Sequence, residues 1–74
     1  MHEGEMKGVM IGAGFFAHLH AEAWSRMDGA RIVAIADLIP DRARQFADQW
    51  GIGIAYHDAE TMIHNEKPDF VYFN

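Results

Sequence analysis

Four short apolar runs alternate with three stretches of helical spacing along almost the whole chain. The runs cover residues 7–11, 31–36, 52–56 and 70–73. They are nearly free of polar alternation, which is typical of strands that are covered on both faces in a parallel sheet. The pattern therefore predicts the order β-α-β-α-β-α-β and an α/β fold, with right-handed crossovers between parallel strands.

The spacing of apolar residues also predicts which face of the first two helices meets the sheet. In the first helix the predicted stripe is Phe16, Leu19, His20, Ala23 and Met27, and Asp28-Gly29 closes the helix. In the second helix the predicted stripe is Ala43, Phe46, Ala47 and Trp50. Pro40 fits the first turn of this second helix, and Gly51 is expected to adopt a left-handed conformation at its end.

The third helix is predicted from its boundaries as much as from its spacing. Asp58 is a suitable N-cap for a two-turn helix that carries Ala59, Met62 and Ile63. Pro68 ends this helix because it disfavours helical geometry at the residue before it. Gly53 is expected to weaken the strand that precedes the helix.

Length and composition narrow the class of protein. The 74 residues allow at most one small domain, and 50% of them are hydrophobic. The absence of cysteine excludes disulfides, and no apolar run reaches the roughly 18 residues of a membrane span. Eleven acidic against six basic residues argue against nucleic acid as a partner. Since the start also lacks the layout of a signal peptide, we expect a cytoplasmic protein without a membrane partner.

A glycine turn lies directly between the first strand and the first helix. It has the pattern Gly12-x-Gly14-x-x-Ala17 and includes Ala13, Phe15 and Phe16. In a dinucleotide site, the first glycine allows the tight turn and the second lets the pyrophosphate approach the backbone. The small third residue lets the helix pack closely on the strand, and the N–H groups at the start of the helix attract the phosphates.

The second strand ends at an acidic residue, which strengthens this interpretation. Asp37 follows Gly12 by 25 residues, where its carboxylate would accept hydrogen bonds from the adenosine ribose and repel a 2′-phosphate. Leu38 adds no positive charge, but Arg42 could reach a 2′-phosphate, so NAD is favoured and NADP stays possible. The alternative interpretation is an ordinary α/β domain in which a glycine turn and a strand-ending acid bind nothing.

Other polar residues give no catalytic or metal site. His18 and His20 are two residues apart on a predicted helix, so their side chains point about 200° apart and cannot share one ion. His20 is expected to bond to the backbone, and His57 shows no ligand-like partner. Ser25 is the only serine and lies in no nucleophile motif. Trp24 and Trp50 are expected to anchor the core.

Taken as a set, several motifs resemble those of the glucose-fructose oxidoreductase / inositol dehydrogenase (Gfo/Idh/MocA) family. The matching segments are Gly12–Ala17, His20 with Ala23-Trp24, Ala36-Asp37, Arg42–Gly51, Tyr56–Asp58 and Lys67–Tyr72. The resemblance covers residues 7–74 and implies a Rossmann-like parallel sheet with strand order 3-2-1-4. It implies that residues 7–74 are the first part of a larger doubly wound dinucleotide-binding domain, preceded by a tail at 1–6. It also places Asn74 near the cofactor.

The same resemblance implies an NAD(P)-dependent oxidoreductase that transfers hydride to or from a sugar, sugar acid or cyclitol. We expect its substrate domain to be absent from this chain, the chain alone to be inactive, and the parent to be a homo-oligomer. Glu66-Lys67-Pro68 matches the catalytic tripeptide of the family in sequence but not in position. The tripeptide of the family follows the strand after the one that begins at Phe70, whereas this one precedes Phe70, so no catalytic residue is assigned. The alternative function is a non-catalytic nucleotide-binding module, or one that completes the sheet of another subunit.

Overall fold

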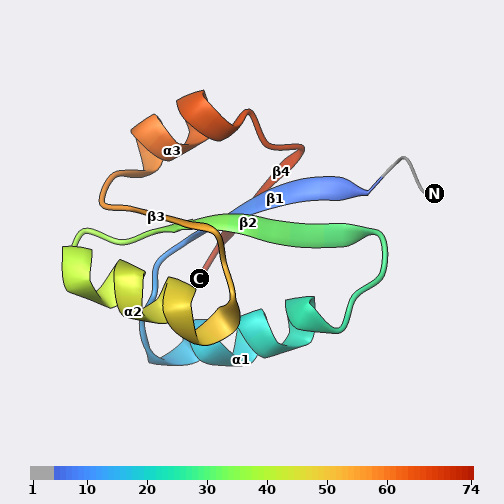
Figure 1. Cartoon of the computed structure of the whole chain (residues 1–74), viewed down its shortest axis with the longest axis horizontal. Helices are drawn as coiled ribbons and strands as arrows, with labels where there is room; N and C mark the ends of the chain where they lie inside the picture. Colours follow the sequence, from blue (N-terminus) through green and yellow to red (C-terminus); the bar gives the residue numbers. More distant parts are fainter. Residues whose placement is uncertain (1–4) are drawn as a thin grey trace.

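The computed structural model describes residues 5–74 and contains one parallel sheet with helices on both faces (Figure 1). The sheet has four strands in the order β3-β2-β1-β4, as the family resemblance implied. Its elements are β1 (Met6–Ile11), α1 (Phe15–Ser25), β2 (Ala30–Ala36), α2 (Pro40–Trp50), β3 (Ile54–Tyr56), α3 (Ala59–Glu66) and β4 (Phe70–Phe73). β1 therefore begins at Met6, one residue earlier than predicted, and residues 1–4 of the expected tail lie outside the described residues.

Alternating side chains of β1 and β2 supply two separate cores. Met10 and Ile35 point to the face that α1 and α2 cover, where they pack with Phe46. Val9 and Ala34 point to the opposite face. There they meet Met62 of α3, which is fully buried. The continuous apolar runs are thus explained by a sheet that is covered on both sides, with α1 and α2 below it and α3 above it in Figure 1.

The predicted inner face of α1 is wrong. Its buried residues are Ala17 and Ala21, whereas Phe16 and Leu19 are 68% and 62% exposed. Met27 is exposed as well. Because α1 has a single charged residue, Glu22, its spacing fits more than one stripe, and close packing on β1 selects the stripe with the smallest side chains.

Aromatic contacts fasten the far side of α1 to β4. The rings of Trp24 and Phe70 stack with centroids 4.9 Å apart. The hydroxyl of Tyr72 lies 2.7 Å from Nδ1 of His20. His20 therefore bonds to a side chain and not, as predicted, to the backbone. Trp24 is half-buried and packs against the core, as the sequence indicated.

The boundaries of α2 and α3 follow the predicted chemistry. Gly51 ends α2 with a φ of 68°, and the Asp58 carboxylate accepts hydrogen bonds from the N–H groups of Glu60 and Thr61 at the start of α3. Lys67 ends α3 in the left-handed region, with a φ of 49°. β3 starts two residues later than predicted, because the N–H of Ile52 donates to the carbonyl of Ala47 and closes α2 instead of joining the sheet.

Candidate cofactor-binding site

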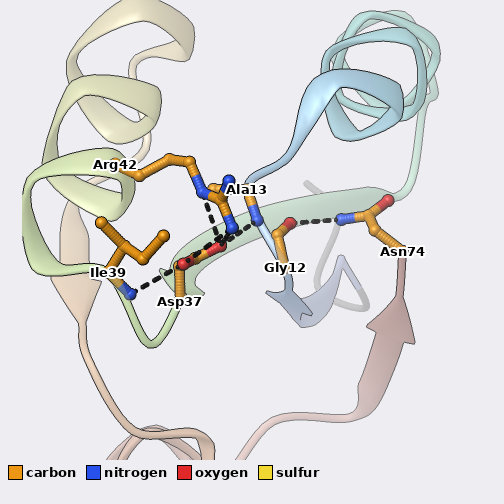
Figure 2. Close-up of polar contacts among 6 residues, drawn as sticks. All are labelled: Gly12, Ala13, Asp37, Ile39, Arg42 and Asn74. Atoms are coloured by element: carbon orange, nitrogen blue, oxygen red, sulfur yellow. Dashed lines mark hydrogen bonds and ion pairs between the residues drawn. The ribbon is translucent and has the colours of Figure 1, made fainter.

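The glycine turn leaves β1 at the carboxyl edge of the sheet and leads directly into α1 (Figure 2). Gly12 has a φ of 98°, which side-chain-bearing residues rarely adopt, and its N–H donates to the carbonyl of Ala36 at 2.8 Å. The predicted need for glycine at the turn is confirmed at this position. Ala17, the third small residue of the motif, is 1% exposed where α1 packs on the sheet.

Gly14 is a glycine for a different reason. It is the N-cap of α1 with a φ of −78°, which any residue can adopt. Apart from its chain neighbours, no atom of the described chain lies within 4 Å of the position that a Cβ would take. The fold itself therefore leaves room for a side chain here. At Gly14 the backbone is therefore bare and faces open space, as the approach of a pyrophosphate requires.

The N–H groups that open α1 face the same space. Phe15 and Phe16 occupy its first two positions, where N–H groups have no carbonyl partner within the helix. These groups and the helix dipole favour an anion. The two phenyl rings are mostly exposed and contact each other edge to face, with centroids 5.3 Å apart.

Asp37 ties the glycine turn to the end of β2. Its carboxylate accepts the N–H of Ala13 at 2.8 Å and the N–H of Ile39 at 2.8 Å (Figure 2). Arg42 of α2 adds an ion pair at 3.1 Å. Asp37 is only 8% exposed, and no other charged residue among residues 5–74 is buried. The sequence placed this acid at the site but did not predict that it also holds the turn together.

The same contacts control the ionisation of Asp37. Burial favours the neutral acid and on its own would raise the pKa. The hydrogen bonds from Ile39, Ala13 and Arg42, together with the charge of Arg42, outweigh burial and lower the pKa below the usual 3.8. Asp37 is therefore a carboxylate, and an acceptor only, at neutral pH.

Asn74 lies on the other side of the glycine turn, beyond β4. Its side-chain amide donates to the carbonyl of Gly12 at 2.8 Å, and its backbone N–H donates to the carbonyl of Ile11 at 3.0 Å. Figure 2 shows Asn74 and Asp37 flanking the turn from the ends of β4 and β2. The structure thus brings together the residues that the sequence singled out from three separate strands.

A hollow of about 450 Å³ opens beside Asp37 at the carboxyl ends of β1 and β2. Its walls include Gly12, Leu38 and Arg42, and also five residues that the sequence analysis did not assign to the site: Ile11, Ala36, Ile39, His57 and Ala59. His57 could have been found from its position, because it directly follows β3, the neighbour of β2 in the sheet. A larger hollow of about 600 Å³ lies at the amino ends of β2 and β3. Ligands of open α/β sheets bind at the carboxyl ends, so the smaller hollow is the candidate site.

The histidines of α1 are engaged separately. Nδ1 of His18 accepts the indole N–H of Trp50 at 2.9 Å, whereas Nδ1 of His20 faces the Tyr72 hydroxyl. Within residues 5–74, no three histidine, aspartate or glutamate side chains gather as a metal site would require. The longest helices of this part of the chain have 11 residues, and none is suited to crossing a bilayer.

A four-stranded parallel sheet with a glycine turn and an acid at its carboxyl edge defines a dinucleotide-binding type of α/β protein. Residues 6–73 match the sequence profile of Gfo/Idh/MocA, an oxidoreductase family with an NAD-binding Rossmann fold. The chain belongs to this family, which confirms the resemblance seen in its motifs.

Three known proteins illustrate the relationship. D-apiose dehydrogenase from Paraburkholderia graminis is 45% identical over 65 residues, which cover 88% of this chain and 17% of that protein. Myo-inositol 2-dehydrogenase from Thermotoga maritima is 34% identical over 66 residues, which cover 89% of this chain and 20% of that protein. The crystal structure of an oxidoreductase from Agrobacterium radiobacter, in complex with NAD+, L-tartaric acid and magnesium, has a TM-score of 0.87 at 42% identity. That match covers 93% of this chain and 20% of the other, so the chain spans about a fifth of the length of such relatives.

Proposed function

We propose that residues 7–74 are the first part of the dinucleotide-binding domain of a longer NAD(P)-dependent oxidoreductase, whose substrate domain lies outside this chain. The observation that carries the proposal is the way the glycine turn is fixed at the carboxyl ends of the strands. There the bare glycine turn is held between a buried carboxylate on one side and Asn74 on the other. This arrangement fits a dinucleotide, because it places N–H donors beside an ionised acceptor.

Each predicted site residue has a role in this proposal. The turn of Gly12, Ala13 and Gly14 would let the pyrophosphate approach the backbone, and the N–H groups of Phe15 and Phe16 would bind it. Asp37 would accept hydrogen bonds from the adenosine ribose, with Leu38 and Arg42 beside the adenosine. Asn74 would lie near the cofactor, next to the glycine turn.

The proposed reaction is hydride transfer between the nicotinamide and the carbinol carbon of a sugar, sugar acid or cyclitol. The names of the apiose and inositol dehydrogenases support this substrate class. When bound, the nicotinamide supplies or accepts the hydride, while this chain holds and orients the cofactor. The favoured cofactor is NAD, since Asp37 repels a 2′-phosphate. The cytoplasmic location, the homo-oligomeric parent and the inactivity of the isolated chain remain predictions.

Isothermal titration calorimetry of the full-length parent with NAD tests the proposal. Gly14→Ala adds a methyl group where the fold has room but the pyrophosphate would approach, so we expect NAD affinity to fall at least about tenfold. Gly53→Ala is the matched control. Gly53 precedes β3 at the amino ends of the strands, and an added Cβ there would make an ordinary 3.7 Å contact with the carbonyl of Val33. Equal affinities for the two variants, with unchanged melting temperatures, would contradict the cofactor assignment.

A second proposal is a non-catalytic module that completes the sheet of another subunit. It is supported by β4, which pairs only with β1 among the described strands and leaves its other edge free. An open reading frame that ends at Asn74 would favour this module. A frame that continues through a substrate domain would favour the oxidoreductase.

A further inference from the structure

The accepting capacity of the Asp37 carboxylate is fully used within the chain. Oδ2 accepts the N–H of Ala13 at 2.8 Å and Nε of Arg42 at 3.2 Å. Oδ1 accepts the N–H of Ile39 at 2.8 Å and a terminal nitrogen of Arg42 at 3.3 Å. A carboxylate has about four lone-pair sites, so these four bonds leave none for a ligand.

The proposed role of Asp37 conflicts with this arrangement. Two ribose hydroxyls can donate to the carboxylate only if existing donors leave. The N–H groups of Ala13 and Ile39 belong to the backbone of the turns that lead into α1 and α2 and are fixed by the fold. The side chain of Arg42 is 48% exposed, flexible, and attached to Asp37 only through its tip. Arg42 is therefore the donor that a ribose can displace.

We propose that Arg42 is a displaceable latch on Asp37 and sets the choice between NAD and NADP. This inference rests on the proposed cofactor function. The ribose hydroxyls of NAD take the place of the guanidinium on the carboxylate, so the latch weakens NAD binding. A 2′-phosphate instead takes the guanidinium as its own partner, so the same residue strengthens NADP binding.

The chemistry of the two groups supports opposite effects on the two cofactors. A guanidinium binds phosphate oxygens with two parallel hydrogen bonds, as it now binds the carboxylate. Leu38, which follows Asp37, offers no charge for a phosphate, and His57 is the other titratable side chain on the wall of the hollow besides Asp37. Among the described residues that line this hollow, Arg42 is therefore the one with a permanent positive charge.

The test is calorimetric titration of the full-length parent with NAD and with NADP. For Arg42→Ala we expect NAD to bind about three- to tenfold more tightly, because no guanidinium has to be displaced. We expect NADP to bind at least about tenfold more weakly, since a charge-assisted bond to its phosphate is lost. Alanine suits an exposed helical position, so the variant should fold.

Arg44→Ala is the matched control. Arg44 is a second exposed arginine of α2, pairs with Asp41 at 3.6 Å and does not contact Asp37, so both affinities should stay within about twofold. A second measurement follows the Arg42 side chain directly: its Nε–H signal in the NMR spectrum should shift on addition of NAD, and the Nε–H signal of Arg44 should not.

Two results would overturn the latch. In one, Arg42→Ala weakens NAD and NADP by the same factor, which would mean that Arg42 merely holds Asp37 in place. In the other, neither affinity changes. Failure of the proposed function is distinct, because the unaltered protein would then bind neither dinucleotide and Gly14→Ala would have no effect.

Discussion

Asp37 links the stability of the fold to the proposed binding site. Its carboxylate joins the turn after β1 to the start of α2 through the N–H groups of Ala13 and Ile39. Because these bonds favour the charged form, the pKa of Asp37 in the folded chain lies below 3.8. A lowered pKa means that the stabilisation is present above the usual pKa and is lost as the pH falls through the lowered one.

We therefore predict that Asp37→Asn destabilises the parent at neutral pH and less so in acid. An amide cannot replace the ionised acceptor for both N–H groups, which should cost about 1–3 kcal/mol at pH 7. The measurement is thermal unfolding between pH 7 and pH 3. The gap between the two proteins should narrow below about pH 4. Asp48→Asn, at an exposed position of α2, removes the same charge as a control; a gap that stays constant for Asp37→Asn would argue against the linkage.

The sequence could predict the identity of these site residues better than their contacts. The glycine pattern and the strand-ending acid are local features, so Gly12 and Asp37 were found at once. The ion pair between Arg42 and Asp37 was not predicted, because helical spacing only shows that Arg42 faces outward. Whether it reaches the carboxylate depends on how α2 leaves β2, which is a property of the tertiary structure. The same holds for the amide of Asn74 and the carbonyl of Gly12, which are 62 residues apart.

At the scale of elements, the contrast in polarity around a helix decided which faces could be predicted. α2 has charged and apolar sides. Ala43, Phe46 and Ala47 of its predicted stripe are buried as expected, and Trp50 is partly buried against the same core. α1 has few charges, so its outer residues Phe16 and Leu19 looked as suitable for the core as Ala17 and Ala21. Only the short distance between the helix and β1 distinguishes them, and no spacing rule contains that distance.

The end of α3 gives a prediction about Lys67. This residue has a positive φ, which is unique among the non-glycine residues of the described chain, and it lies at the amino end of β4, away from the glycine turn. Lys67→Gly should stabilise the parent by about 0.5–1 kcal/mol, because the relief of the left-handed geometry exceeds the added entropy of the unfolded chain. Thermal unfolding measures this change, and Lys67→Val should have the opposite sign.

The same variant tests the position of the Glu66-Lys67-Pro68 tripeptide. Lys67 lies at the amino ends of the strands, whereas Asp37 lies at their carboxyl ends. Lys67→Gly should therefore leave NAD affinity and turnover of the parent unchanged. A large loss of turnover with unchanged stability would instead identify Lys67 as a catalytic residue.

At the scale of the whole molecule, the chain has more apolar surface than its own elements can cover. Phe15, Leu38 and Phe73 are 79%, 88% and 71% exposed. Phe15 begins α1, Leu38 follows β2 and Phe73 ends β4. β4 also has one unpaired edge among the strands of residues 5–74. A single sheet of this size buries a smaller fraction of its surface than a full domain does, so little free energy remains to offset the loss of chain entropy.

We therefore predict that the 74-residue chain on its own is marginally folded. Circular dichroism should show a broad thermal transition, and light scattering should show association through the free edge of β4 as the concentration rises. A version of the parent that continues through the next strands should instead unfold in one cooperative step, because the added strands cover Phe73 and pair with β4. A sharp transition for a monomer of the 74-residue chain would show that the two cores around β1 and β2 suffice by themselves.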